Sequence, residues 1–360
     1  MIENRKYNFS AGPSCLPEEV LVQVREELLN YNSSGSSVME LSHRGKEFVE
    51  IAETAEQNVK DLFNINDDYE VLFLQGGASQ QFAMIPQNFL QGRTADYIHS
   101  GQWAIKAINE AKVLGNVNMV TDSKENNYTS IANPDSWKTS KDAVYFHYTS
   151  NETIGGLQFK SAPKVNIPLV SDMSSDILSR EIDINQFALI YAGAQKNIGP
   201  AGLTLVIINK EFLKDASTNL PVFYQYKTHI EAKSMYNTPP CFSLYVAGLV
   251  FKWMKKIGLK EIENRNEEKA KKLYNFIDSS SFYSNPVDPK FRSSMNIPFI
   301  LKSEELDAQF LKEAEQENLL NLKGHRSVGG MRASIYNAMP IDGVNKLIDF
   351  MKDFEEKNDK

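Results

Sequence analysis

The chain has 360 residues, 42% hydrophobic and 24% charged, which is typical of a folded protein with a large domain and a smaller one. Its net charge of −7, with no run of lysine and arginine, argues against a nucleic-acid-binding surface. No apolar run reaches the roughly 18–20 residues of a membrane helix, and the first ten residues lack the apolar stretch of a signal peptide. The two cysteines, Cys15 and Cys241, fit a reducing compartment and show no metal-ligand spacing. We therefore expect a cytoplasmic protein.

The first predicted elements are an extended segment, Tyr7 to Leu16, and a helix that starts at Pro17. Apolar strands and helices then alternate up to about residue 210. We expect helices at 47–62, 80–90 and 104–114, and strands at 70–74, 96–99, 144–148, 167–170, 189–192 and 203–208. Short apolar strands without strict alternation are buried on both faces. Their alternation with helices predicts an α/β fold with a mostly parallel sheet covered by helices.

The last hundred residues follow a different pattern. Residues 211–242 are irregular, and a helix is expected at 243–257. Beyond it we expect a charged helix at 261–276, strands at 295–301 and 331–336, and helices at 303–318 and 341–356. This order predicts a separate small α+β domain. We expect a large domain over residues 16–259, and a small domain formed by residues 1–15 and 260–360.

The residues that follow the apolar strands give the first indication of a ligand, because open α/β sheets bind ligands at the carboxyl ends of their strands. The first strand is followed by Gly76, Gly77, Ala78, Ser79 and a helix. Such a turn can bind phosphate, because glycines allow a close approach and the helix N-terminus offers unpaired N–H groups. It matches neither the P-loop nor the dinucleotide-binding glycine pattern. A tight turn without a ligand is an equal alternative.

Three further strand ends carry chemically useful side chains. Trp103 can stack on a flat heterocycle, although, taken alone, packing beneath its helix is the favoured alternative. Thr153 lies in a hydroxyl-rich loop and can donate to a ring oxygen, with a plain turn as the alternative. Asp172 comes two residues after the strand predicted at 167–170, where an unpaired carboxylate would be costly to bury. Its natural partner is the protonated ring nitrogen of pyridoxal 5'-phosphate (PLP).

Lys196 lies in the segment Gly193-Ala194-Gln195-Lys196, between two apolar strands. Desolvation there would lower its pKa and make the amine nucleophilic. A surface lysine is the alternative, but the apolar strands on both sides count against it. Phosphate turn, indole, hydroxyl, carboxylate and lysine together match the five parts of PLP that a protein must hold: phosphate, ring face, phenolic oxygen, ring nitrogen and aldehyde.

A second group of residues is suited to an anionic substrate. The chain has five histidines, and two of them precede an arginine, in His43-Arg44 and His325-Arg326. Arg332 follows the second pair. Arginine forks bind carboxylate or phosphate in bidentate fashion, so these residues suit a substrate with several negative charges. Exposed salt bridges are the alternative.

The segment from Tyr191 to Lys196, with Gly202-Leu203-Thr204 after it, resembles the PLP-lysine signature of the class V aminotransferases. Other segments that resemble members of this family are Asn8 to Pro13, Ser42 to Arg44, Gly76 to Ser79, Tyr148 to Thr153 and Gly324 to Ser334. The similarity runs from residue 8 to about residue 340. It implies the fold-type-I architecture of PLP-dependent transferases and no metal.

The resemblance also implies how PLP is bound. Lys196 would hold it as a Schiff base and move the proton, and Asp172 would pair with its ring nitrogen. Trp103 would stack on the ring, and Thr153 would bind near the phenolic oxygen. The residues expected to hold the phosphate are Ala78, Ser79 and Gln195, with Asn237 and Thr238 from the neighbouring subunit of a homodimer.

For the substrate, the resemblance implies that Arg332 binds the α-carboxylate. The residues expected to bind the phosphate of phosphoserine, or the distal carboxylate of glutamate, are His43, Arg44, His325 and Arg326. The expected activity is transfer of the amino group between glutamate and 3-phosphohydroxypyruvate, giving phosphoserine and 2-oxoglutarate in serine biosynthesis. Alternatives are another class V enzyme, such as an alanine–glyoxylate-type aminotransferase, and a non-catalytic binding protein with the same fold.

Overall fold

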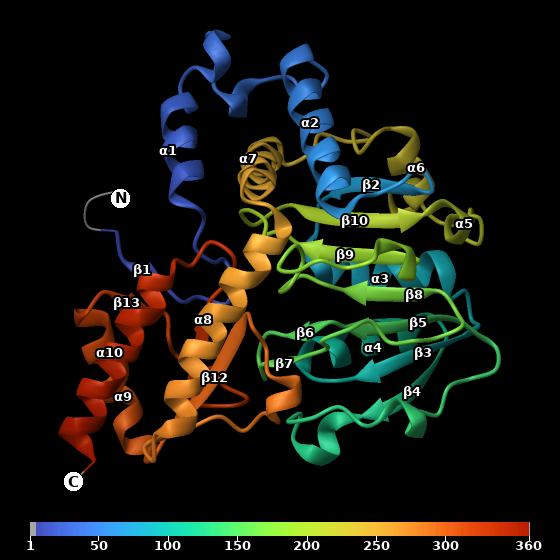
Figure 1. Cartoon of the computed structure of the whole chain (residues 1–360). Coiled ribbons are helices and arrows are strands. Elements are labelled where there is room, and N and C mark those ends of the chain that lie inside the picture. Colours follow the sequence, from blue (N-terminus) through green and yellow to red (C-terminus); the bar gives the residue numbers. More distant parts are fainter. Residues whose placement is uncertain (1–4, 360) are drawn as a thin grey trace.

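A sheet of seven strands forms the centre of the larger part of this computed structural model, which describes residues 5–359 (Figure 1). The strand order is β2-β10-β9-β8-β5-β3-β4. In chain order the strands are β2 Tyr69–Leu74, β3 Thr94–His99, β4 Asn116–Asp122, β5 Ala143–Thr149, β8 Leu169–Asp172, β9 Leu189–Gly193 and β10 Thr204–Asn209. β10 is antiparallel to β2 and β9, and the other neighbouring strands are parallel. The predicted mostly parallel sheet is confirmed.

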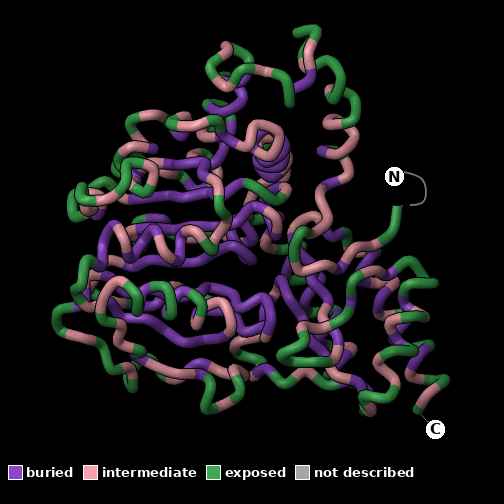
Figure 2. Tube along the Cα trace, turned by 180° about the vertical axis from the view of Figure 1, so that it is seen from behind, coloured by how far each residue is buried: buried purple, intermediate pink, exposed green. Residues whose placement is uncertain are grey.

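Helices cover both faces of this sheet. α2 (Lys46–Phe63) and α7 (Cys241–Ile257) pack on one face, and α3 (Gly77–Phe89) and α4 (Gln102–Leu114) pack on the other. Successive residues of β9 point to opposite faces, so Ile190 lies in the first cluster and Tyr191 in the second. This burial on both faces explains why the central strands are mostly apolar, and Figure 2 shows their continuous burial.

The edge strand β4 was not predicted from the sequence. Only Val120 of its seven residues is buried, and polar residues such as Asn116 and Asn118 alternate with apolar ones. An edge strand has a neighbour on one side only, so it does not need the continuous apolar run that marks the central strands. The other differences are small: α3 starts at Gly77 rather than at residue 80, and Asp172 is the last residue of its strand.

A three-stranded antiparallel sheet, β11-β12-β14, forms the centre of the C-terminal part. Its elements are α8 Leu259–Ser279, β11 Tyr283–Ser284, β12 Asn296–Leu301, α9 Asp307–Gln316, β13 Leu319–Leu320, β14 Met331–Ser334 and α10 Ile341–Asn358. The N-terminal strand β1 (Tyr7–Asn8) pairs with β13, and Phe9 lies in the core of this part. The domain boundaries at residues 15 and 259 stay a prediction, and residues 1–4 and 360 lie outside the described residues.

A long arm and several short elements complete the chain. The arm comprises α1 Glu18–Glu27 and the 3₁₀ turns η1 Tyr31–Ser33 and η2 Val38–Glu40, and Figure 1 shows it extending beyond the sheet before it enters α2. The remaining elements are η3 Ser123–Asn126, η4 Pro134–Ser136, β6 Asn151–Glu152, β7 Leu157–Gln158, η5 Ile184–Gln186, α5 Lys210–Leu213, η6 Val222–Tyr224, α6 Tyr226–Glu231, η7 Pro289–Phe291 and η8 Glu304–Leu306. Across residues 5–359, no helix is both long enough and apolar enough to cross a bilayer.

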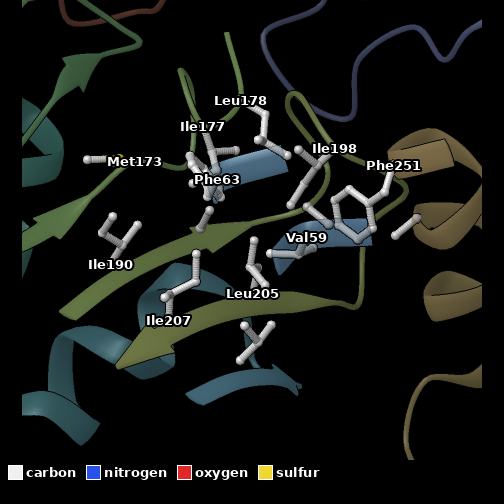
Figure 3. Packing of buried hydrophobic residues seen from close by; sticks show 14 of the residues in the cluster. Val59, Phe63, Met173, Ile177, Leu178, Ile190, Ile198, Leu205, Ile207 and Phe251 are labelled. Carbon is white, nitrogen blue, oxygen red and sulfur yellow. The ribbon is translucent and has the colours of Figure 1, made fainter. Parts of the chain in front are cut away.

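The packing of α7 on the sheet gives a first test of this architecture. Phe251 is fully buried and stacks on Phe73 with ring centroids 6.3 Å apart, and Figure 3 shows it in the same cluster as Val59 and Leu205. Phe251→Ala should lower the free energy of unfolding by about 3–5 kcal/mol, because it leaves a cavity. Val113→Ala, at a site that is 79% exposed, should change it by less than about 0.5 kcal/mol. Equal urea midpoints for the two variants would contradict this packing.

Candidate active site

Three predicted residues, one of which supplies a buried amine, meet near the carboxyl ends of the central strands. Lys196 follows the end of β9 by three residues and is only 8% exposed. Its Nζ donates a hydrogen bond to Thr153 Oγ1 at 2.7 Å. The same Nζ lies 4.7 Å from the centroid of the Trp103 ring, at the start of α4. Amine, hydroxyl and indole therefore form one site, although they come from three separate segments of the chain.

Asp172 closes this site from the neighbouring strand. Its carboxylate oxygen Oδ1 accepts hydrogen bonds from the backbone N–H and the hydroxyl of Ser174, at 2.9 and 2.6 Å. The same hydroxyl accepts a bond from the backbone N–H of Gly193 at 3.0 Å, which ties Asp172 to the segment that carries Lys196. Burial raises the pKa of Asp172, and the positive charge of Lys196 opposes that rise. Ser174 was not predicted, because its bond with Gly193 forms only in the folded sheet.

Burial and the neighbouring charges determine how far the Lys196 amine is protonated. Burial lowers its pKa to about 8, and the negative charges of Asp172 and Glu152 oppose this shift. The positive charge of Arg332 contributes to the lowering. At neutral pH a useful fraction of the amine is therefore unprotonated and nucleophilic, as covalent catalysis by a lysine requires.

Glu152 is a second residue that the sequence did not identify. Its buried carboxylate accepts hydrogen bonds from the backbone N–H groups of Trp103 and Ala104, at 3.1 and 2.9 Å. It thus caps α4 and fixes the residue whose ring faces Lys196. Burial raises the pKa of Glu152 to about 7. A Cβ atom at Gly101 would lie 2.5 Å from Glu152 Cδ, so this position requires glycine.

The predicted phosphate turn lies two strands from Lys196. Leu74 of β2 pairs with Thr204 of β10, and Thr204 pairs with Gly193 of β9. Gly76 and Gly77 adopt φ values of 82° and 64°, which favour glycine, and α3 begins there. Ala78 and Ser79 follow in the first turn of α3, where backbone N–H groups lack helical partners. Gln195, which precedes Lys196, is half-buried.

These residues fit PLP. Within the described part of the chain, Trp103 Nε1 and Arg332 Nε are buried but have no hydrogen-bond partner, as expected where a ligand completes the site. Lysine, a buried carboxylate and a helix N-terminus supply an amine, a partner for a pyridinium nitrogen and donors for a phosphate. The residues able to hold PLP are therefore Ala78, Ser79, Trp103, Thr153, Asp172, Gln195 and Lys196.

The C-terminal part contributes positive charge to the same site. Arg332 lies on β14, and its Nη1 donates to the backbone oxygen of Thr153 at 3.4 Å. His325 is half-buried in the loop before β14, and its Nδ1 contacts Ser327 Oγ at 2.7 Å. Burial lowers the pKa of His325, and the charges of Arg332, Arg326 and Lys106 lower it further. Arg332, His325 and Arg326 thus gather as predicted, together with Lys106, which was not predicted.

Two predicted pairs do not reach this site within one chain. His43 and Arg44 lie in the loop before α2, and across residues 5–359 no hydrogen bond or ion pair joins them to Lys196 or Arg332. Asn237 and Thr238 lie in the loop before α7, where Thr238 O accepts a bond from Gln75 Nε2 at 2.8 Å. Their predicted roles in binding substrate and cofactor stay predictions.

Comparison with known proteins gives consistent matches over almost the whole chain. The Aminotransferase class-V family model matches residues 6–347. A phosphoserine aminotransferase of Nitrosomonas europaea is 53% identical, over 98% of this chain and 99% of the relative. The solved phosphoserine aminotransferase of Bacillus circulans subsp. alkalophilus is 46% identical with a TM-score of 0.96, over 99% of each chain. A PLP-bound phosphoserine aminotransferase of Trichomonas vaginalis is 40% identical with a TM-score of 0.90, over 97% of this chain and 100% of that one.

The pKa of Lys196 provides a direct test of the pocket. In cofactor-free protein labelled by ¹³C reductive methylation, we expect the Lys196 signal to titrate at about pH 8, because burial disfavours its charged form. Exposed lysines should titrate near about 10.4. Asp172→Asn removes a negative charge that raises the pKa, so it should move the Lys196 midpoint lower still. A midpoint for Lys196 among those of the exposed lysines would contradict the proposed environment.

Proposed function

Because the chain belongs to the class V aminotransferase family, we propose that it transfers an amino group between glutamate and 3-phosphohydroxypyruvate, giving phosphoserine and 2-oxoglutarate. The observation that carries this proposal is the convergence of Lys196, Thr153, Asp172 and Trp103 beside the cationic side chain of Arg332. Relatives at 52–54% identity over nearly their full length are named phosphoserine aminotransferases, which supports this substrate over that of an alanine–glyoxylate-type enzyme. The reaction belongs to serine biosynthesis, and we place it in the cytoplasm, where the two free cysteines fit.

When bound, PLP supplies an electron sink for the negative charge that develops at the substrate Cα. The Lys196 amine, with a pKa of about 8, removes the proton at this carbon and returns it, because both its protonation states are populated near neutral pH. Asp172, held by Ser174, is placed to keep a proton on a ring nitrogen. Glu152 holds the start of α4, so that Trp103 keeps a fixed ring face toward Lys196.

The arginines and histidines orient the substrate. Arg332 Nη1 lies 3.4 Å from the backbone oxygen of Thr153, next to the Lys196 amine, so its guanidinium is placed for the α-carboxylate that both amino donors share. His325 and Arg326 belong to the more exposed loop and suit the anion at the far end of the substrate. One pocket can accept phosphoserine and glutamate, because both carry an anion at that end.

We propose a homodimer with shared active sites as the functional form. Exposed apolar side chains are concentrated on two segments: Leu28, Leu29 and Met39 on the arm with Val49 at the start of α2, and Val222, Tyr224 and Tyr236 around α6. An ion pair between Lys233 and Glu53, at 3.4 Å, holds the second segment against α2. These apolar segments flank the two pairs that do not reach the site of their own chain. A second copy on this face would cover the apolar side chains and bring these pairs to its own site.

The half-reaction with an amino donor tests the chemistry and the substrate. The purified protein should convert from its PLP absorbance to that of the amino form with phosphoserine and with glutamate, and only weakly with serine, which lacks the distal anion. Lys196→Ala should abolish turnover. Arg332→Ala should reduce kcat/KM for both donors by about 100-fold or more, since they share the α-carboxylate. Arg265→Ala, at an exposed ion pair on α8, serves as control. A preference for serine, or a defect with phosphoserine alone in Arg332→Ala, would contradict the assignment.

Complementation tests the shared site. A mixed dimer of Lys196→Ala and Arg44→Ala holds one complete site if Arg44 acts on the partner. Co-expression in equal amounts should therefore restore about a quarter of wild-type activity, since half the dimers are mixed and each has one intact site. Lys196→Ala with Arg332→Ala should restore nothing, because both residues belong to the site of one chain. Equal results for the two mixtures would show that Arg44 acts within its own chain.

A further inference from the structure

Lys106 lies beside the active-site indole, one helical turn beyond Trp103 on α4. Its Nζ is 4.2 Å from the centroid of the Trp103 ring, and Lys196 Nζ is 4.7 Å from the same centroid. One ring is therefore in contact with the ammonium groups of two lysines, of which one is the buried amine of the site and the other is exposed. Lys106 thus belongs to the surroundings of the site, although no motif in the sequence indicates it.

The positive charge of Lys106 is not used elsewhere. In the described part of the chain, its side chain forms no ion pair with a carboxylate, and its Nζ makes a cation–π contact with Trp103. A cation–π contact at an exposed site contributes little and leaves the charge in place. The ammonium group therefore remains available to an anion that enters the cleft.

Lys106 faces the cationic cluster of the C-terminal part. The charges that act on His325 come from Arg332 and Arg326 on the same part, and from Lys106 on α4. Lys106 is the member of this set that belongs to α4, so the positive charges that act on His325 come from both parts of the chain. Lys106 and Lys196 contact the same indole ring, and Arg332 bonds to Thr153, which also accepts a hydrogen bond from Lys196.

We propose that Lys106 is a specificity-determining residue that binds the distal anion of the substrate from the α4 side and favours phosphoserine over glutamate. This role rests on the proposed function. A phosphate monoester carries about 1.5–2 negative charges near neutral pH and three acceptor oxygens, whereas the distal carboxylate of glutamate carries one charge and two oxygens. A lysine acts on a phosphate as a point charge that needs no fixed orientation. Removing it should therefore affect the phosphorylated donor more.

The test compares Lys106→Gln with Lys112→Gln in the holoenzyme, because both lysines are exposed on the same helix and only Lys106 touches Trp103. The half-reaction is followed with phosphoserine and, separately, with glutamate. Lys106→Gln should lower kcat/KM for phosphoserine by about tenfold or more, mainly through KM, and that for glutamate by less than about threefold. Lys106→Arg should retain most of the preference, and Lys112→Gln should match the wild type.

The outcomes separate this role from the proposed function. If the wild type reacts with both donors but Lys106→Gln loses activity equally toward them, Lys106 only supports Trp103 and the proposal is overturned. An unchanged ratio of the two donors in Lys106→Gln overturns it as well, while the proposed function stands. If the wild type itself does not react with phosphoserine, the proposed function and the role of Lys106 fail together.

Discussion

The whole site depends on the desolvation of one amine whose charge is partly balanced by two buried carboxylates. Burial removes water from Lys196 and lowers its pKa, while Asp172 and Glu152 limit the decrease. Without burial the amine would be almost fully protonated at neutral pH, and without the carboxylates a buried cation would be far more costly. A lowered pKa alone does not make a nucleophile. Burial also lowers the pKa of Lys269, to about 7, but its Nζ donates to the backbone oxygens of Ile335, Tyr336 and Met339 and is used structurally.

The fold brings these groups together at the carboxyl ends of the central strands. Asp172 ends β8 and Lys196 follows β9, and these parallel neighbours place both side chains at one edge. Ser174 links the two segments by accepting from Gly193 and donating to Asp172. Glu152 and Thr153 are consecutive, and one holds α4 while the other accepts from Lys196. A shift of any of these strands would therefore move the residues able to hold PLP and also the backbone oxygen of Thr153 to which Arg332 donates.

The sequence predicted the residues whose role depends on local position, and it missed those whose role depends on tertiary partners. Lys196, Asp172 and Trp103 could be chosen as candidates because each lies at or after the end of an apolar strand, and the carboxyl ends of parallel strands lie on the same side of the sheet. Glu152 is an ordinary polar-loop residue until its partners, the N–H groups of α4, come from a segment some 50 positions earlier. Lys106 is one lysine among many on charged helices. Strand β4 lacks an apolar run because it lies at the edge.

We propose that Lys196, and not the buried Lys269, is the amine that holds PLP. Borohydride reduction of the holoenzyme fixes the cofactor to the lysine that carries it, and peptide mass spectrometry then locates it. We expect the added mass on the peptide that contains Lys196, and none on the peptide that contains Lys269, whose amine is held by three backbone oxygens. Cofactor mass on Lys269, or on an exposed lysine with Lys196 unmodified, would contradict the account.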